Sequence, residues 1–129
     1  MKNLFGLVML LLLTVGSVNG QYRTFTKGKN GGDIIGKDEV RWEVVNAGQA
    51  ITFYPINADG SVIKSKLKDV EIDVLFLGDS SSQIFHPEST DGHYTVYVDS
   101  NRIIYYYFIS ATIDGKRHEM KEQMVVYGK

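Results

Sequence analysis

The sequence feature that most constrains the fold is the stretch of residues 101–116, which combines strict alternation with a turn. Between Ile103 and Ile113 every second residue is apolar, which is the period of a β-strand with one face in a core. The stretch ends in Asp114-Gly115, a pair that favours a two-residue hairpin loop because both positions tolerate positive φ. The sequence therefore predicts a long strand that turns back at Asp114.

This turn also predicts the register of the returning strand. With a two-residue loop, the expected pairs are Ile113 with Lys116, Ala111 with His118, Ile109 with Met120, Tyr107 with Glu122 and Tyr105 with Met124. Glu122 then falls on the core-facing side, where an unpaired carboxylate is costly. Its position argues against a fully regular ladder, and a one-residue bulge between Met120 and Glu122 would turn it outward.

Shorter alternating stretches come before this strand, at residues 38–46, 49–57, 68–77 and 93–99. Turn-forming residues separate them roughly every ten positions, a spacing typical of a sandwich of two sheets. We therefore expect an all-β fold, a single antiparallel immunoglobulin-like β-sandwich of about eight strands. The expected core residues are Trp42, Val44, Phe53, Ile72, Val74, Tyr94, Val96, Tyr105, Tyr107 and Ile109.

Asp91-Gly92 followed by Tyr94 supports the immunoglobulin-like assignment. In such sandwiches a tyrosine just inside a late strand forms a tyrosine corner, in which its hydroxyl bonds to the upstream backbone. We expect Tyr94 to make this bond.

The first twenty residues have the composition of a secretory signal peptide. Lys2 precedes an apolar run over residues 4–15, and small residues follow as far as Gly20. The run is shorter than the roughly 20 residues that a membrane-spanning helix needs. We expect a signal peptide over residues 1–20, cleaved after Gly20, one domain over residues 21–129, and no membrane span after cleavage. An uncleaved anchor is the alternative.

The chain contains no cysteine, so it has no disulfide and no lipid attached through an N-terminal cysteine. An exported domain without disulfides fits a bacterial periplasm better than an animal secretory pathway. We therefore expect an exported protein that is periplasmic or secreted.

Charge and motifs exclude several functional classes. The 14 basic and 15 acidic residues nearly balance, and no basic stripe suggests nucleic acid as a partner. The serines of residues 80–82 lack the glycines of a nucleophile elbow, and no phosphate-binding loop is present. We therefore do not expect an enzyme.

Two groups of residues remain as candidate sites, and the first is a soft-metal site. His118 and Met120 are two apart in the returning strand, so their side chains point to the same side. Imidazole with thioether suits copper, above all the reduced ion, or another soft metal. A third ligand would come from His93 or His86. The alternative is that His118 and Met120 are packing residues, since methionine fills irregular gaps in cores.

The second candidate is a partner-binding strip formed by Ile104, Tyr106 and Phe108. These residues lie on the other face of the long strand predicted before Asp114. Uncovered aromatic strips mark surfaces that bind partners, here another cell-envelope protein. The alternative is that the N-terminal arm or a loop covers the strip.

One stretch carries a resemblance to a known group. Asn30-Gly31-Gly32, Ile34, Val40 and Glu43-Val44-Val45 precede a strand containing Phe53-Tyr54 and an Asp-Gly turn, and a looser likeness continues through Gly92-His93-Tyr94 to His118. This pattern resembles small exported bacterial proteins that read His-Gly-Gly-x-Val and then Glu-Val-Val. From Gly31 to Val45 the matching spacing needs no gap.

The resemblance implies a periplasmic immunoglobulin-like sandwich of the kind that often accompanies heavy-metal efflux systems. It also implies metal contacts at the opening His and at a late-strand His. The late His matches His118, but the opening His is Asn30 in this chain. The expected function is a non-enzymatic accessory protein in heavy-metal handling in the cell envelope. The alternative is an interaction or structural module of the envelope that uses the aromatic strip or a sheet edge.

Overall fold

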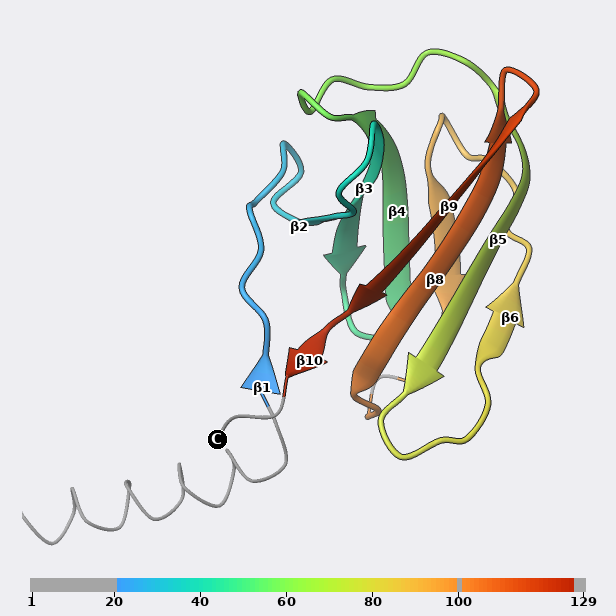
Figure 1. The fold of residues 1–129 in the computed structure, drawn as a ribbon. Coiled ribbons are helices and arrows are strands. Elements are labelled where there is room, and N and C mark those ends of the chain that lie inside the picture. Colours follow the sequence, from blue (N-terminus) through green and yellow to red (C-terminus); the bar gives the residue numbers. More distant parts are fainter. Residues whose placement is uncertain (1–20, 100, 127–129) are drawn as a thin grey trace, which may run out of the picture.

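The computed structural model describes residues 21–99 and 101–126, which form a sandwich of two antiparallel four-stranded sheets (Figure 1). The first sheet contains, in spatial order, β2 (Asp33–Ile35), β3 (Val40–Asn46), β4 (Ala50–Asn57) and β7 (Tyr94–Tyr97). The second contains β6 (Gln83–Phe85), β5 (Leu67–Phe76), β8 (Ile104–Ile113) and β9 (Lys116–Gln123). A separate two-stranded pair joins β1 (Gln21–Tyr22) to β10 (Val125–Val126).

This architecture confirms the predicted all-β sandwich. The part of the chain that the structure describes forms no helix, and so none that is long and apolar enough to cross a membrane. The signal peptide expected at residues 1–20 lies outside the described residues.

The β8–β9 hairpin has the predicted turn and register. Asp114 and Gly115 have φ of 51° and 80°, the positive values that a two-residue hairpin loop of this kind requires. The ladder runs from Ile113–Lys116 to Tyr106–Gln123 without a shift. The expectation that Glu122 would disturb this ladder is therefore wrong, and the reason lies in its hydrogen-bond partners, described below.

A bulge in β8, the long strand predicted from the sequence, shows that two expectations about its residues were wrong. Leu75 pairs with Tyr106 while Phe76 pairs with Ile104, so Tyr105 is an extra residue between the two pairs. A one-residue bulge reverses the faces beyond it. Ile104 therefore turns into the core, where it is 4% exposed, and does not belong to the outer strip. Tyr105, expected in the core, is only half-buried.

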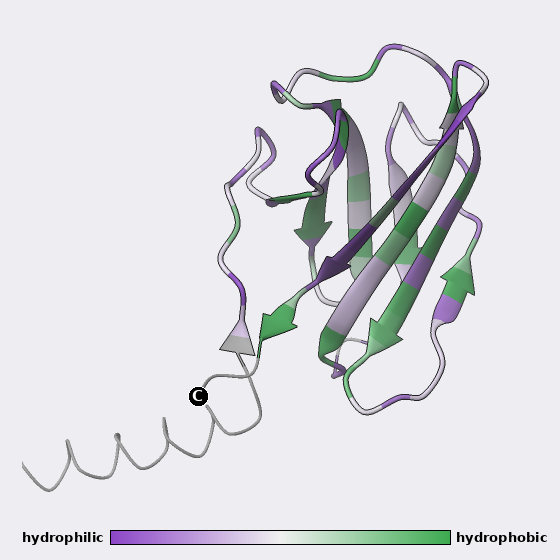
Figure 2. Cartoon of the chain, viewed as in Figure 1, coloured by the Kyte–Doolittle hydropathy of each residue, from purple (hydrophilic) through white to green (hydrophobic). Residues whose placement is uncertain are grey.

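The other nine expected core residues are all buried. The aromatic core residues make edge-to-face contacts. Phe53 of the first sheet contacts Tyr107 of the second, with 5.3 Å between ring centroids, and Trp42 contacts Tyr94 at 6.2 Å. Among the described residues, the Tyr94 hydroxyl has no hydrogen bond to upstream backbone, so the expected tyrosine corner does not form. Figure 2 shows apolar and polar residues alternating along β5 and β8, whereas β9 is largely hydrophilic.

Candidate functional site

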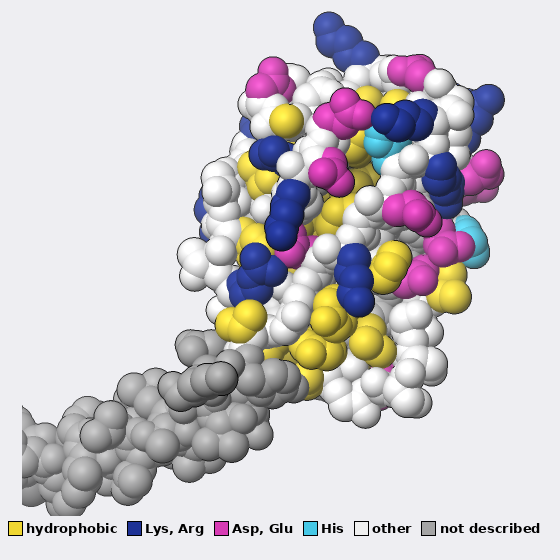
Figure 3. Space-filling view, in the orientation of Figure 1, with side chains coloured by type: hydrophobic (Ala, Val, Ile, Leu, Met, Phe, Trp, Pro, Cys, Tyr) yellow, Lys and Arg dark blue, Asp and Glu magenta, His cyan; other side chains and the backbone are white. Residues whose placement is uncertain are grey.

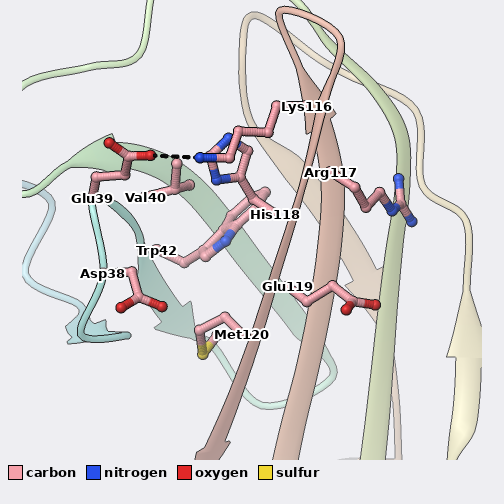
Figure 4. A pocket seen from close by; sticks show the side chains of 9 residues that line it. All are labelled: Asp38, Glu39, Val40, Trp42, Lys116, Arg117, His118, Glu119 and Met120. Atoms are coloured by element: carbon pink, nitrogen blue, oxygen red, sulfur yellow. Dashed lines mark hydrogen bonds and ion pairs between the residues drawn. The ribbon is translucent and has the colours of Figure 1, made fainter.

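The expected metal ligands divide between two places. His118 and Met120 line a hollow of about 460 Å³, together with Trp42 and the acidic Asp38 and Glu39. Figure 4 shows both side chains on one side of β9, while those of Arg117 and Glu119 point to the other side. The structure thus brings the predicted imidazole and thioether together at one surface.

His93 does not line this hollow. Its ring packs 5.2 Å from that of Tyr54 in the first sheet. His86 lies beside Glu71 on the second sheet, with 3.9 Å between imidazole Nε2 and carboxylate Oε1. Within residues 21–99 and 101–126, no three His, Cys, Asp or Glu side chains are grouped to hold a metal ion.

The outer face of the second sheet carries the predicted aromatic strip without Ile104. One row crosses all four strands, through Ile84 in β6, Asp73 in β5, Phe108 in β8 and Lys121 in β9. Ile84 is 57% exposed and Phe108 44% exposed, both large values for apolar side chains. Figure 3 shows hydrophobic side chains gathered over the lower half of this face and charged side chains over its upper half. We call this surface the outer apolar face.

A hollow of about 240 Å³ opens in the outer apolar face. Its lining residues are Asp73, Leu75, Ser80, Ser82, Tyr106, Phe108 and Lys121. The Lys121 ammonium lies 4.4 Å from the centroid of the Tyr106 ring and 5.7 Å from that of Phe108. These cation–π contacts occupy the lysine without covering the exposed part of Phe108.

Asp73 is the chemically unusual member of this hollow. Its Oδ1 atom is enclosed and has no hydrogen-bond partner in the described part of the chain. Burial raises the pKa of Asp73 above its ordinary value, and the charge of Glu71 and a hydrogen bond with Glu71 raise it further. The charge of His86 acts in the opposite direction.

The N-terminal arm, which we define as residues 21–32, does not cover this face. It runs along the side of the sandwich formed by β2 and β3, while β5 and β6 lie on the far side (Figure 1). Its first strand pairs with β10. The expected alternative, in which the arm hides the strip, is therefore wrong.

The arm instead ends on a buried glutamate. Glu43 is 2% exposed and accepts hydrogen bonds from the backbone N–H groups of Asn30 and Gly32, both at 2.8 Å. The Asn30 side-chain amide donates a third bond at 3.1 Å. A Cβ atom on Gly28 would lie 2.3 Å from Cδ of Glu43, so the loop needs a glycine there to approach the carboxylate. The spaced residues Asn30-Gly31-Gly32 and Glu43 thus form one structural unit in this chain.

A second buried glutamate holds the beginning of the arm. Glu122 is 7% exposed, and its carboxylate accepts hydrogen bonds from Arg23 Nη1 at 2.8 Å and from the Gly36 N–H at 3.0 Å. These two donors compensate the burial of the charge. Glu122 can therefore stay on the core-facing side of a regular ladder.

Sequence reasoning missed the roles of both glutamates. Alternation placed Glu43 on the polar face of its strand, yet Trp42, Glu43 and Val44 are all buried because the arm covers that side as well. Arg23 and Glu122 are separated by 99 positions, so no local spacing connects them. For Glu122 the available signal was an acidic residue at an inward position, which requires a partner. Glu43 stood at an outward position by alternation and gave no such signal.

Comparisons with known proteins identify no similar protein. No protein-family model matches this chain, and searches of curated proteins and of solved structures find no match either.

Proposed function

We propose that this protein is a non-enzymatic binding module that engages a protein partner through the outer apolar face. One observation carries the proposal: Ile84 and Phe108 are large apolar side chains, about half exposed, in a single row across the sheet. Tyr106 and Leu75 extend the surface around the hollow. Apolar surface with aromatic residues at its centre and charges around it is typical of protein interfaces.

We infer further that the sandwich is of the immunoglobulin-like kind. The chain leaves the first sheet after β4, returns for β7, and leaves again for β8. Such crossings between sheets support the Greek-key connections of that architecture. The leader-like composition of residues 1–20 supports export, so the proposed partner is another protein of the cell envelope.

Site-specific photo-crosslinking tests the proposed interface. A photoreactive phenylalanine analogue is placed at Phe108, at Ile84 or, as control, at Tyr97, which is 73% exposed on β7 of the other sheet. In cells of the native host, we expect the same crosslinked partner from positions 108 and 84 and not from position 97. Equal crosslinking from all three positions, or none, would contradict the proposal.

A second candidate function is soft-metal handling, favoured by the shared hollow of His118 and Met120. Calorimetric titration of the full protein with copper(I) and with zinc tests it. We expect copper(I) to bind more tightly than magnesium or calcium, titrated in parallel, because the described residues form no oxygen cage. We expect His118→Ala to abolish copper(I) binding, because it removes the imidazole ligand. The variant His93→Ala serves as control, since His93 packs on Tyr54 outside this hollow. Binding that survives His118→Ala would remove this candidate.

A further inference from the structure

The loop that binds Glu43 contains a chemically reactive pair, Asn30-Gly31. Among the asparagines after residue 20, only Asn30 precedes a glycine, whereas the others precede alanine or arginine. Asparagine is a thermolabile residue, and it reacts fastest before glycine, whose missing side chain leaves the backbone nitrogen open to the preceding amide. Asn30 and Gly31 are both exposed. Apart from its chain neighbours, no atom of the described residues lies within 4 Å of a Cβ placed on Gly31, so water reaches this pair.

The reaction open to this pair is deamidation through a cyclic imide. The Gly31 backbone nitrogen bonds to Cγ of Asn30, and the bond from Cγ to Nδ2 breaks, so that ammonia leaves with the proton of the Gly31 nitrogen. Water then opens the ring at one of its two carbonyl carbons. Opening at Cγ gives aspartate, and opening at the backbone carbonyl gives isoaspartate, in which the main chain runs through the side-chain carbons. Overall, one water is consumed and one ammonia is released, and no other reactant is needed.

In the folded loop, hydrogen bonds hold both reacting groups. The Gly31 N–H donates to the Gly28 carbonyl at 3.0 Å, and the Asn30 side-chain amide donates to Glu43 at 3.1 Å. These bonds keep the nitrogen and the amide in place, so the reaction requires the loop to leave Glu43 for a moment. Exposed loops with few apolar contacts undergo such local openings. The Glu43 carboxylate therefore controls how often Asn30 can react.

The product of deamidation no longer fits the glutamate. The N–H groups of Asn30 and Gly32 converge on the same Glu43 oxygen, Oε2, both at 2.8 Å. Isoaspartate adds one atom to the main chain between these two donors, so they lose the spacing that lets them meet at one oxygen. Aspartate and isoaspartate both lack the amide donor and add a negative charge beside the buried Glu43, where like charges repel.

We propose that Asn30 is a deamidation site guarded by Glu43, and that its conversion to isoaspartate releases residues 28–32 from the sandwich. Because the altered loop cannot bind Glu43 again in the same way, released chains accumulate as the protein ages. This assignment is independent of the outer apolar face, since the N-terminal arm runs along the side formed by β2 and β3 (Figure 1).

Peptide mass spectrometry of the full protein, stored folded at mildly alkaline pH, tests the site. We expect a gain of about 1 Da at Asn30 and not at Asn57, which is also exposed but precedes alanine. In guanidinium chloride, where the loop no longer binds Glu43, conversion of Asn30 should be at least about tenfold faster. Equal rates in the folded and unfolded protein, or conversion at Asn57 as fast as at Asn30, would overturn the proposal. A folded protein in which Asn30 stays intact would overturn it too.

Hydrogen exchange tests the release of the loop. In protein that carries isoaspartate at position 30, separated by chromatography, the Gly32 N–H should exchange at least about tenfold faster than in the unaltered protein. The Leu77 N–H is the control, because it donates to the Ile103 carbonyl at 2.7 Å at the ends of β5 and β8 in the second sheet. Its exchange should not change. An unchanged rate at Gly32 would mean that the product still binds Glu43, which contradicts the release.

Two variants test the guarding role of Glu43. Glu43→Gln weakens the attraction for the three donors of the loop, so Asn30 should deamidate at least about fivefold faster. Glu39→Gln, which neutralises an exposed carboxylate paired with Lys116, should leave the rate unchanged. An unchanged rate in Glu43→Gln would show that Glu43 is not the guard. If Glu43→Gln does not fold, the comparison of the folded and unfolded unaltered protein still decides the question.

Discussion

A carboxylate between two exposed apolar side chains reduces the stability of the sheet that holds it, and Asp73 is such a residue. Its enclosed oxygen has no donor, and the neighbouring Glu71 adds repulsion. Such costs persist mainly at sites that are used, because selection for stability alone would replace the residue. The buried Glu43 and Glu122 differ in this respect, because donors are present for both of their carboxylates.

The raised pKa of Asp73 predicts a pH dependence of folding. The folded protein binds this proton more tightly than the unfolded chain, whose reference pKa is 3.8. Stability contributed by the protonated form is therefore lost as pH rises from about 4 through the raised folded-state pKa. We expect Asp73→Asn to gain stability relative to the original protein over this range, as measured by urea unfolding at a series of pH values. A difference that shrinks as pH rises would contradict this assignment.

At the scale of elements, the loop before β2 and strand β3 depend on each other. The loop supplies three donors to Glu43, and strand β3 supplies the buried carboxylate that orders the loop. The Asn-Gly-Gly and Glu residues of the resemblance therefore have a structural role here that requires no metal. Where the resembling pattern has a histidine, the Asn30 side chain donates to the glutamate.

The close approach of this loop gives a second prediction. Gly28→Ala should lower the free energy of unfolding by about 2–3 kcal/mol, since the new methyl group overlaps the Glu43 carboxylate and forces the loop outward. Gly60→Ala is the control: Gly60 has φ of +89° but no atom within 4 Å of an added Cβ, so only backbone strain of about 1–2 kcal/mol is expected. Denaturant unfolding of both variants measures the difference. Little or no loss in Gly28→Ala would mean that the loop moves aside freely.

The elements show what the sequence could and could not predict. The register of β8 and β9 followed from the Asp114-Gly115 turn, because a local turn fixes a ladder residue by residue. Alternation also predicted core residues correctly at nine of ten positions, although the core contains further residues, such as Ile35 and Phe76, that were not predicted. The bulge at Tyr105 has no comparable local signal, since it arises from how β8 pairs with the distant β5. The outer strip was consequently predicted one residue too long, at Ile104, and without the central Asp73.

At the scale of the whole molecule, one ion pair connects the two ends of the described chain. Arg23 and Glu122 meet at 2.8 Å, and Glu122 is nearly buried. Removing one partner of such a pair leaves an uncompensated charge, which costs more than the pair contributes.

This asymmetry gives a third prediction. Arg23→Met should lower the free energy of unfolding by roughly 1–3 kcal/mol, because it leaves the Glu122 carboxylate with only the Gly36 N–H. Arg23→Met combined with Glu122→Gln should recover part of this loss, since a neutral amide still accepts from Gly36 without needing a cation. A double-mutant cycle by urea denaturation checks the recovery. Strictly additive losses would show that the pair has no coupling.

The pairing of β1 with β10 and of Arg23 with Glu122 also affects when these contacts can form during synthesis. A chain is made from its first residue to its last, and β1 has no partner until residues 125 and 126 have been added. Glu122 is added shortly before them, so until that part of the chain is made the arm has neither its strand pairing nor its ion pair. Contacts of such long sequence separation form slowly and late. The contacts of β1 and Arg23 are therefore completed only by residues 122–126, and a chain interrupted before residue 122 keeps residues 21–23 without these contacts.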